Sequence, residues 1–173
     1  YYLYYMGNYG DGDWWTHRNN QRIGLAIADS PYGPWQRFNQ PVLDVTEGCW
    51  DDLMTSNPSC CQAPDGRFIH MYKAVSSKGK PPFGGEVLHG VAFSDSPTGP
   101  FVKHPEPLFH TDDSQFALED PFIWCQNGQL FALIKDQGCF FSDSERALVL
   151  FESNDGLDWR PAPNPKAVTR DIP

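Results

Sequence analysis

A 13-residue segment of this chain occurs twice. Residues 23–35, IGLAIADSPYGPW, return 66 residues later as HGVAFSDSPTGPF at residues 89–101, with seven of the 13 positions identical. A looser third copy, LFESNDGLDW, covers residues 150–159. In each copy an apolar run leads into a turn rich in Asp, Ser and Gly and then into an aromatic residue, which predicts a β-hairpin. Three related hairpins predict a repeat architecture.

Each hairpin is preceded by further strand-like segments. Apolar and aromatic runs occupy residues 1–7, 67–74 and 129–136, and the last two follow the turn signals PDG and QNG, with another such run before each turn. Four antiparallel strands that recur about every sixty residues are typical of a β-propeller blade. We therefore expect an all-β chain, with a β-sandwich whose hairpins are alike by chance as the alternative.

Composition agrees with this fold class. The 25 aromatic residues (12 Phe, 7 Tyr and 6 Trp), 15 Gly and 16 Pro suit many short strands joined by turns, and no segment shows a sustained helical period. The expected architecture is a single partial β-propeller domain of about three four-stranded antiparallel blades. Its blade units cover roughly residues 1–48, 49–112 and 113–173.

Three blades are fewer than the four to eight that typically close a propeller. Two explanations stay open: the chain is a piece of a longer protein, or two copies associate to complete the ring. Open sheet faces would leave aromatic side chains uncovered, so we expect a homo-oligomer, with a dimer as its simplest form.

Charge narrows the range of partners. Lys and Arg number 13 against 22 Asp and Glu, a formal net charge of −9, which disfavours nucleic acid. No apolar run is long enough to span a membrane and no signal peptide is evident, so no membrane partner is expected. Aromatic faces and carboxylates suit a carbohydrate partner, because sugar rings stack on the former and donate hydrogen bonds to the latter.

No cofactor or metal centre is expected from the cysteines and histidines. The five cysteines show neither a CxxC pair nor a zinc-binding spacing, and their odd number leaves at least one thiol free within a single chain. The compartment stays open, with a secreted or periplasmic location favoured. A structural calcium or water site at the propeller axis is the one exception considered, with these histidines as candidates: His70, His89, His104 and His110.

The ordered set of motifs resembles a known group of enzymes. Its members are the five-bladed propeller glycosidases of the arabinanase and β-xylosidase type (glycoside hydrolase family 43), together with their invertase and levansucrase relatives. The strings that carry the likeness are YYLYYMG, IGLAIADSPYGPW, TSNPSCCQAPDGRFIHMYKA, GVAFSDSPTGPF, ALEDPFIWCQNGQLFALIKD and LFESNDGLDW. The resemblance implies carboxylate-based hydrolysis of an arabinose-, xylose- or galactose-containing glycan at the propeller axis.

In that group three carboxylates on innermost strands act together. The first-blade Asp would precede Tyr1 and the fourth-blade Glu would follow Pro173, so two of the three expected positions are absent from this chain. The resemblance therefore leaves two functions open. One is a glycosidase that needs residues from a second chain or from missing segments, and the other is a non-catalytic carbohydrate-binding or assembly module.

The Glu119-Asp120-Pro121 segment matches the Asp-Pro element of that group. Adjacent residues of a strand face opposite sides, so only one of the two carboxylates faces a central cavity; we favour Asp120 as the catalytic residue, with Glu119 as the alternative. Asp120 capping a turn beside the proline is the structural alternative. The substrate-binding candidates are Asn57, at the matching place in the second unit, and four others: Asp52, Trp124, Lys135 and His89. The hairpin aspartates Asp29, Asp95 and Asp155 are expected to be structural.

Overall fold

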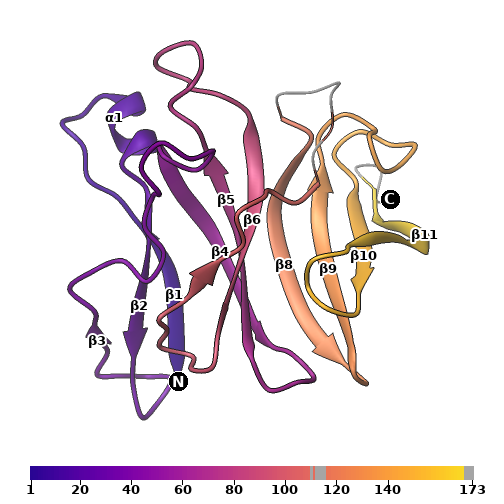
Figure 1. Ribbon diagram of the computed structural model, residues 1–173, viewed down its shortest axis with the longest axis horizontal. Helices are drawn as coiled ribbons and strands as arrows, with labels where there is room; N and C mark the ends of the chain where they lie inside the picture. The colour runs from indigo at the N-terminus through magenta and orange to yellow at the C-terminus, as the bar shows by residue number, and fades with distance from the viewer. Residues whose placement is uncertain (110, 112–115, 170–173) are drawn as a thin grey trace.

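Three antiparallel β-sheets make up almost the whole structure (Figure 1). The computed structural model describes residues 1–109, 111 and 116–169. The sheets follow one another along the chain and stand side by side, so that each forms one blade-like layer. The prediction of an all-β chain with about three blades is therefore confirmed.

The second and third sheets each have four strands in sequence order. The second sheet consists of β4 (Met54–Gln62), β5 (Phe68–Val75), β6 (Val87–Ser94) and β7 (Val102–Lys103). The third sheet consists of β8 (Leu118–Gln126), β9 (Gln129–Asp136), β10 (Leu148–Ser153) and β11 (Arg160–Val168). Both have the four-stranded form that the sequence predicts.

The first sheet differs from this expectation. Its three strands are β1 (Tyr2–Gly7), β2 (Arg22–Ile27) and β3 (Gln36–Arg37). Tyr5 pairs with Gly24 as Tyr72 pairs with Gly90 in the second sheet, so β1 corresponds to β5 rather than to β4. Among the described residues no strand of the first sheet corresponds to β4 or β8, and β1 lies next to β4 instead.

One short helix was not predicted from the sequence. The helix α1 (Trp14–Asn19) has six residues, too few to produce a periodic apolar pattern. The Asp13 carboxylate caps it by accepting hydrogen bonds from the backbone N–H groups of Trp15 and Thr16. In the described part of the chain, no helix has the length and apolar character needed to cross a membrane.

The repeated hairpin turns explain why both copies of the motif carry glycine. Gly33 and Gly99 have φ angles of 84° and 83°, in the left-handed region that glycine enters without a steric penalty. In the second copy the Ser94 and Ser96 hydroxyls accept hydrogen bonds from the backbone N–H groups of Ser96 and Thr98. Serines, rather than Asp95, thus supply these side-chain acceptors in the turn.

The main hydrophobic core lies between the second and third sheets. Alternate residues of β9 are buried, as expected for a strand with one face covered. Phe151 of β10 is fully buried there and packs against Phe109 and Phe141, with ring centroids 4.9 and 5.3 Å away. A smaller cluster that includes Ile23 and Tyr72 joins the first and second sheets.

Phe151→Ala should destabilise the protein strongly. Removing a fully buried phenylalanine leaves a cavity and costs about 3–5 kcal/mol in the free energy of unfolding. Phe122→Ala in the same sheet is the matched control, because Phe122 is 60% exposed. Urea denaturation monitored by circular dichroism measures both. Equal effects of the two substitutions would contradict the position of the core.

Candidate functional site

The two innermost strands described, β4 and β8, lie next to each other at the junction of the second and third sheets. A hydrogen bond of 2.9 Å from the backbone N–H of Ile123 to the Ser59 hydroxyl joins them. Both residues are buried. This contact fixes β8 against β4 and sets the position of the polar residues that precede it on each strand.

Each of these strands contains the same irregularity. Asn57 and Asp120 have φ angles of 48° and 56°, and each directly precedes a proline. The strand pairing shifts register between Ser56 and Ser59 in β4 and between Glu119 and Phe122 in β8. Asn and Asp are among the few non-glycine residues that tolerate this left-handed conformation. The second and third sheets therefore carry matched β-bulges, which re-aim a side chain at this point.

The bulges bring Asn57 and Asp120 into contact. The Asn57 side-chain amide donates a hydrogen bond to Oδ1 of Asp120, and the Ser56 hydroxyl donates one of 2.8 Å to Oδ1 of Asn57. Asp120 is exposed, whereas Ser56 is fully buried. The result is a carboxylate that is open to solvent on one side and held by a neutral amide on the other.

Glu119 has different surroundings from its neighbour. Its Oε1 lies 3.2 Å from the Lys73 ammonium, and its Oε2 accepts from Lys135 at 3.4 Å and from the Gln137 amide at 2.7 Å. The side chain is 21% exposed. Glu119 therefore links β5, β8 and the end of β9 through ion pairs. Lys73 and Gln137 were not identified from the sequence, because only the fold brings them to Glu119.

Two of the predicted binding residues lie beside these carboxylates, and three lie elsewhere. Asn57 contacts Asp120, and Lys135 contacts Glu119. Trp124 lies four residues beyond Asp120 on β8, about 13 Å along a strand, where it stacks on Phe131 with ring centroids 5.4 Å apart. It takes part in aromatic packing on the third sheet rather than in a cluster around Asp120.

Asp52 anchors a loop. Its carboxylate accepts hydrogen bonds from the Ser77 backbone N–H at 2.5 Å and from the Ser77 hydroxyl at 2.8 Å. Partial burial acts to raise the pKa of Asp52, but these bonds stabilise the ionised form more strongly and lower the pKa overall. Asp52 thus holds the segment between β5 and β6.

His89 is buried between the second and third sheets, with 1% of its surface exposed. Burial, together with the nearby Lys73 ammonium, lowers the pKa of His89 to about 3. Among the described residues its Nε2 atom has no hydrogen-bond partner. His89 is therefore a buried, neutral group next to Lys73, its cross-strand neighbour.

The histidines considered for an axial ion are dispersed. His70 is fully buried against Tyr4 and Phe101, and burial lowers its pKa to about 3. His104 lines a surface cavity, and His110 lies outside the described residues. Within residues 1–109, 111 and 116–169, no group of three or more His, Cys, Asp or Glu side chains is arranged to hold a metal ion. All five cysteines carry free thiols.

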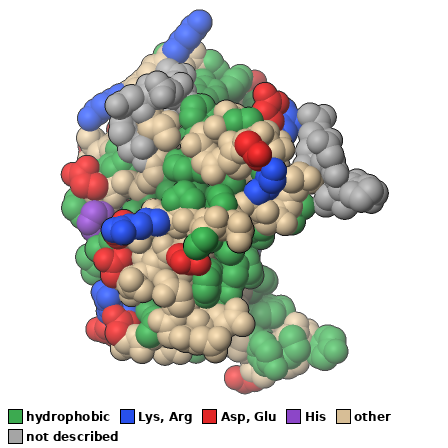
Figure 2. Space-filling model, turned by 90° about the vertical axis from the view of Figure 1, so that its right-hand side faces the viewer, with side chains coloured by type: hydrophobic (Ala, Val, Ile, Leu, Met, Phe, Trp, Pro, Cys, Tyr) green, Lys and Arg blue, Asp and Glu red, His purple; other side chains and the backbone are tan. Residues whose placement is uncertain are grey.

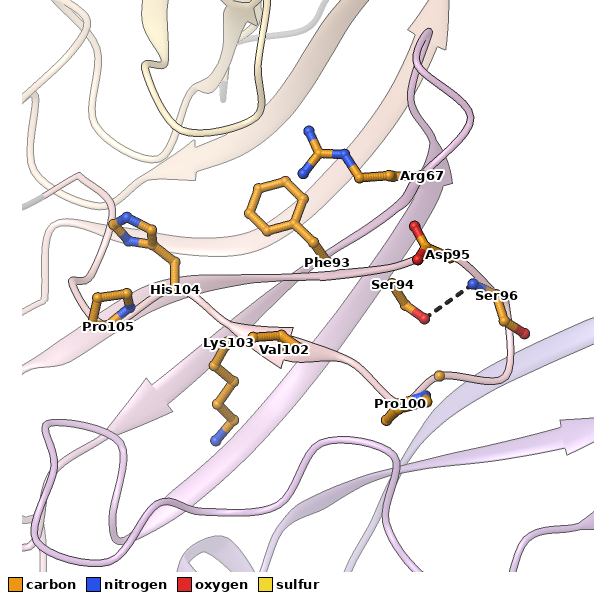
Figure 3. A pocket seen from close by; sticks show the side chains of 11 residues that line it. Arg67, Phe93, Ser94, Asp95, Ser96, Pro100, Val102, Lys103, His104 and Pro105 are labelled. Atoms are coloured by element: carbon orange, nitrogen blue, oxygen red, sulfur yellow. Dashed lines mark hydrogen bonds between the residues drawn. The ribbon is translucent and has the colours of Figure 1, made fainter.

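A cavity of about 570 Å³ lies at the opposite end of the second sheet (Figure 3). Arg67, Phe93 and Asp95 line it, together with His104. Strand pairing places Gln62, Phe68 and Ser94 at this end, whereas Ser56, Lys73 and His89 pair at the end that carries the bulges. The cavity is therefore separate from the Asn57–Asp120 pair.

The overall arrangement is similar to that of solved glycoside hydrolases. Zg3597, a family 117 glycoside hydrolase from Zobellia galactanivorans, aligns with a TM-score of 0.63 and 24% identity over 99% of this chain and 43% of its own. Fructan 1-exohydrolase IIa from Cichorium intybus aligns with a TM-score of 0.70 and 18% identity over 95% and 29%. A thermostable family-43 glycoside hydrolase aligns with a TM-score of 0.62 and 17% identity over 97% and 52%.

These similarities identify the fold. The chain is a partial β-propeller of the glycosidase type. It spans 29% to 52% of the length of these three enzymes. No protein-family model and no curated protein sequence matches it.

Asp52→Asn should destabilise the protein in a pH-dependent way. Because the pKa of Asp52 is lowered in the folded state, its stabilising contribution is complete above the unfolded pKa of about 3.9 and is lost as the pH falls through the folded value. The difference in unfolding free energy between wild type and variant should therefore shrink from about pH 5 towards pH 2. Urea denaturation across this range measures it, and a difference that stays constant would contradict the assignment.

Proposed function

We propose that the chain acts in the hydrolysis of glycosidic bonds in an arabinose-, xylose- or galactose-containing glycan, with Asp120 as a carboxylate that faces the reacting sugar. The observation that carries this proposal is the Asn57–Asp120 pair on adjacent innermost strands of a glycosidase-type propeller. The solved enzymes with this fold include a family 117 glycoside hydrolase and a fructan exohydrolase, which supports a carbohydrate as ligand.

The chemistry favours Asp120 over Glu119. Glycoside hydrolysis develops positive charge on the sugar ring, and a carboxylate beside it must be accessible and ionised to stabilise that charge. Asp120 is exposed and bonded to a neutral amide, whereas Glu119 is engaged by two ammonium groups and an amide. In this proposal Glu119 holds the two lysines in place and Asp120 acts on the substrate.

Most glycoside hydrolases use a pair of carboxylates, so a second one is needed beside Asp120. Asp52 is bound to Ser77 and Glu119 is ion-paired, so neither suits that role. We propose that a second chain or a further segment supplies the missing carboxylate. The alternative function is a non-catalytic carbohydrate-binding or assembly module, which would keep the sugar-binding groups without the acid.

Asp120→Asn should lower turnover about a hundredfold or more, as the loss of comparable electrostatic stabilisation does. Asp95→Asn is the matched control, because Asp95 lies in the hairpin turn at the other end of the sheet, and its turnover should stay near that of wild type. Aryl glycosides of arabinose, xylose and galactose are suitable substrates, with circular dichroism to show that both variants fold. Full activity of Asp120→Asn would exclude Asp120 as the acting carboxylate.

The same assay separates the two functions. If the wild-type chain hydrolyses none of these glycosides while isothermal titration calorimetry detects binding of the corresponding oligosaccharides, the binding-module function is supported. If it hydrolyses one of them and Asp120→Asn does not, the glycosidase function is supported.

We also propose that two copies associate head to tail. The second sheet is covered on both faces by its neighbours, and the outer faces of the first and third sheets resemble those covered faces. Ile69, Met71 and Val91 of the second sheet are fully buried by the third. The corresponding residues of the third sheet, at matching positions in the strand pairing, are only partly buried: Phe131, Leu133 and Leu150. Figure 2 shows hydrophobic side chains gathered on this side of the molecule.

The first sheet has the complementary face. The Tyr5 ring covers Gly24 so closely that a Cβ atom there would lie 2.5 Å from it, as the Tyr72 ring covers Gly90 at 2.4 Å. Tyr72 is fully buried by the first sheet, but Tyr5 is partly exposed, and Leu3 on the same face is 47% exposed. The first sheet of one copy would thus cover the third sheet of another as neighbouring blades cover each other.

Leu3→Lys and Leu133→Lys should each weaken this association, because a charge would be buried in the contact. If the contact is head to tail, a 1:1 mixture of the two variants should dimerise through the one contact that neither substitution touches. Sedimentation equilibrium at micromolar concentration measures all four samples. A monomeric wild type, or a mixture no more associated than the separate variants, would contradict the proposal.

A further inference from the structure

The hydrogen bond between Asn57 and Asp120 crosses from one sheet to the next at a point where it is not needed to hold the strands together. Two residues further along β4, the buried Ser59 hydroxyl already accepts the backbone N–H of Ile123. Around it, the fully buried Met71 and Ile134 belong to the core between the two sheets. The exposed Asn57–Asp120 bond adds little to that packing, so its main effect is to restrict the orientation of the Asp120 side chain.

The chemistry of this bond favours asparagine over aspartate at position 57. Oδ1 of Asn57 accepts from Ser56, so the amide nitrogen, which only donates, must point at Asp120. An aspartate at position 57 would place a second negative charge against Asp120. An alanine or glycine would leave the Asp120 carboxylate free to rotate.

We propose that Asn57 is a positioning residue that fixes the Asp120 carboxylate through its side-chain amide, and that Ser56 in turn fixes the orientation of that amide. This inference deepens the proposed function, since it assigns to Asn57 the orientation of the group that acts on the sugar. The matched bulges supply the geometry. On both strands a residue in the left-handed conformation directly precedes a proline, and this residue carries a donor group in Asn57 and an acceptor group in Asp120.

The orientation can be tested without any activity. In a ¹⁵N-labelled sample, the side-chain amide signal of Asn57 is the one that disappears in Asn57→Gly, a substitution that glycine's tolerance of positive φ makes easy for the backbone. In Asp120→Gly, which leaves the positive φ of Asp120 equally accessible, this signal should move to the position of a side-chain amide without a carboxylate partner. Ser56→Ala should also change it, because the amide loses its fixed orientation. An Asn57 signal that is unaffected by Asp120→Gly would overturn the proposal.

Measurements of turnover then distinguish a positioning role of Asn57 from a purely structural one. Asn57→Gly should lower kcat about tenfold to a hundredfold with little change in KM, because misplacing a catalytic group by an ångström has effects of this size. Asn127→Gly is the matched control, because Asn127 also has a left-handed φ of 53° but lies in the turn between β8 and β9. Its kcat should equal that of wild type.

Three outcomes decide the matter. If Asn57→Gly keeps the wild-type kcat while Asp120→Asn loses it, Asn57 does not position Asp120 and the proposal is overturned. If Asn57→Gly lowers kcat and Asn127→Gly does not, the proposal is supported. If the wild-type chain hydrolyses no glycoside but Asp120→Gly still shifts the Asn57 signal, the contact is supported and the glycosidase function is the part that fails.

Discussion

The packing of one sheet against the next is the interaction on which the rest of the structure depends. A four-stranded sheet with apolar side chains on both faces cannot bury both of them alone. In the second sheet, Tyr72 is buried against the first sheet and Met71 is buried against the third. Because the sheets stack through these faces, their innermost strands converge, and β4 and β8 come into direct contact. The candidate site exists only because of that convergence.

The matched bulges turn this convergence into a polar site. On a regular strand, successive side chains point to opposite faces of the sheet. The register shifts at Ser56–Ser59 and Glu119–Phe122 release both side chains from this alternation. The proline after each one removes a backbone donor where pairing is already interrupted. The exposed Asp120 and the half-buried Asn57 therefore lie directly beside a tightly packed core.

Much of the fold is readable from the repeat in the sequence, whereas the site is readable only in part. The hairpins at residues 23–35 and 89–101 carry their own turn chemistry, so local residues are enough to predict β2 and β6. The helix α1 escapes detection because one short turn has no period. The Asp-Pro and Asn-Pro segments point to β8 and β4, but their pairing with each other depends on how two sheets stack, which no local pattern encodes.

The roles of the charged residues depend on contacts between distant parts of the chain. Glu119 and Asp120 are neighbours in sequence, and no local pattern shows that Glu119 is ion-paired while Asp120 is exposed. Their difference comes from Lys73, which lies 46 residues before Glu119, and from Lys135, its cross-strand partner on β9. Both lysines approach Glu119 because it lies at the junction of the second and third sheets.

This distribution of charge explains how two adjacent carboxylates are accommodated in an acidic chain. Two carboxylates in one unbalanced site would compete for a proton, because each disfavours the ionised form of the other. Here the ammonium groups of Lys73 and Lys135 balance the charge of Glu119, and Asp120 is turned away to a neutral amide by the bulge. Glu119 is thereby an electrostatic support for the strand junction, whereas Asp120 stays exposed and free of any ammonium partner among the described residues.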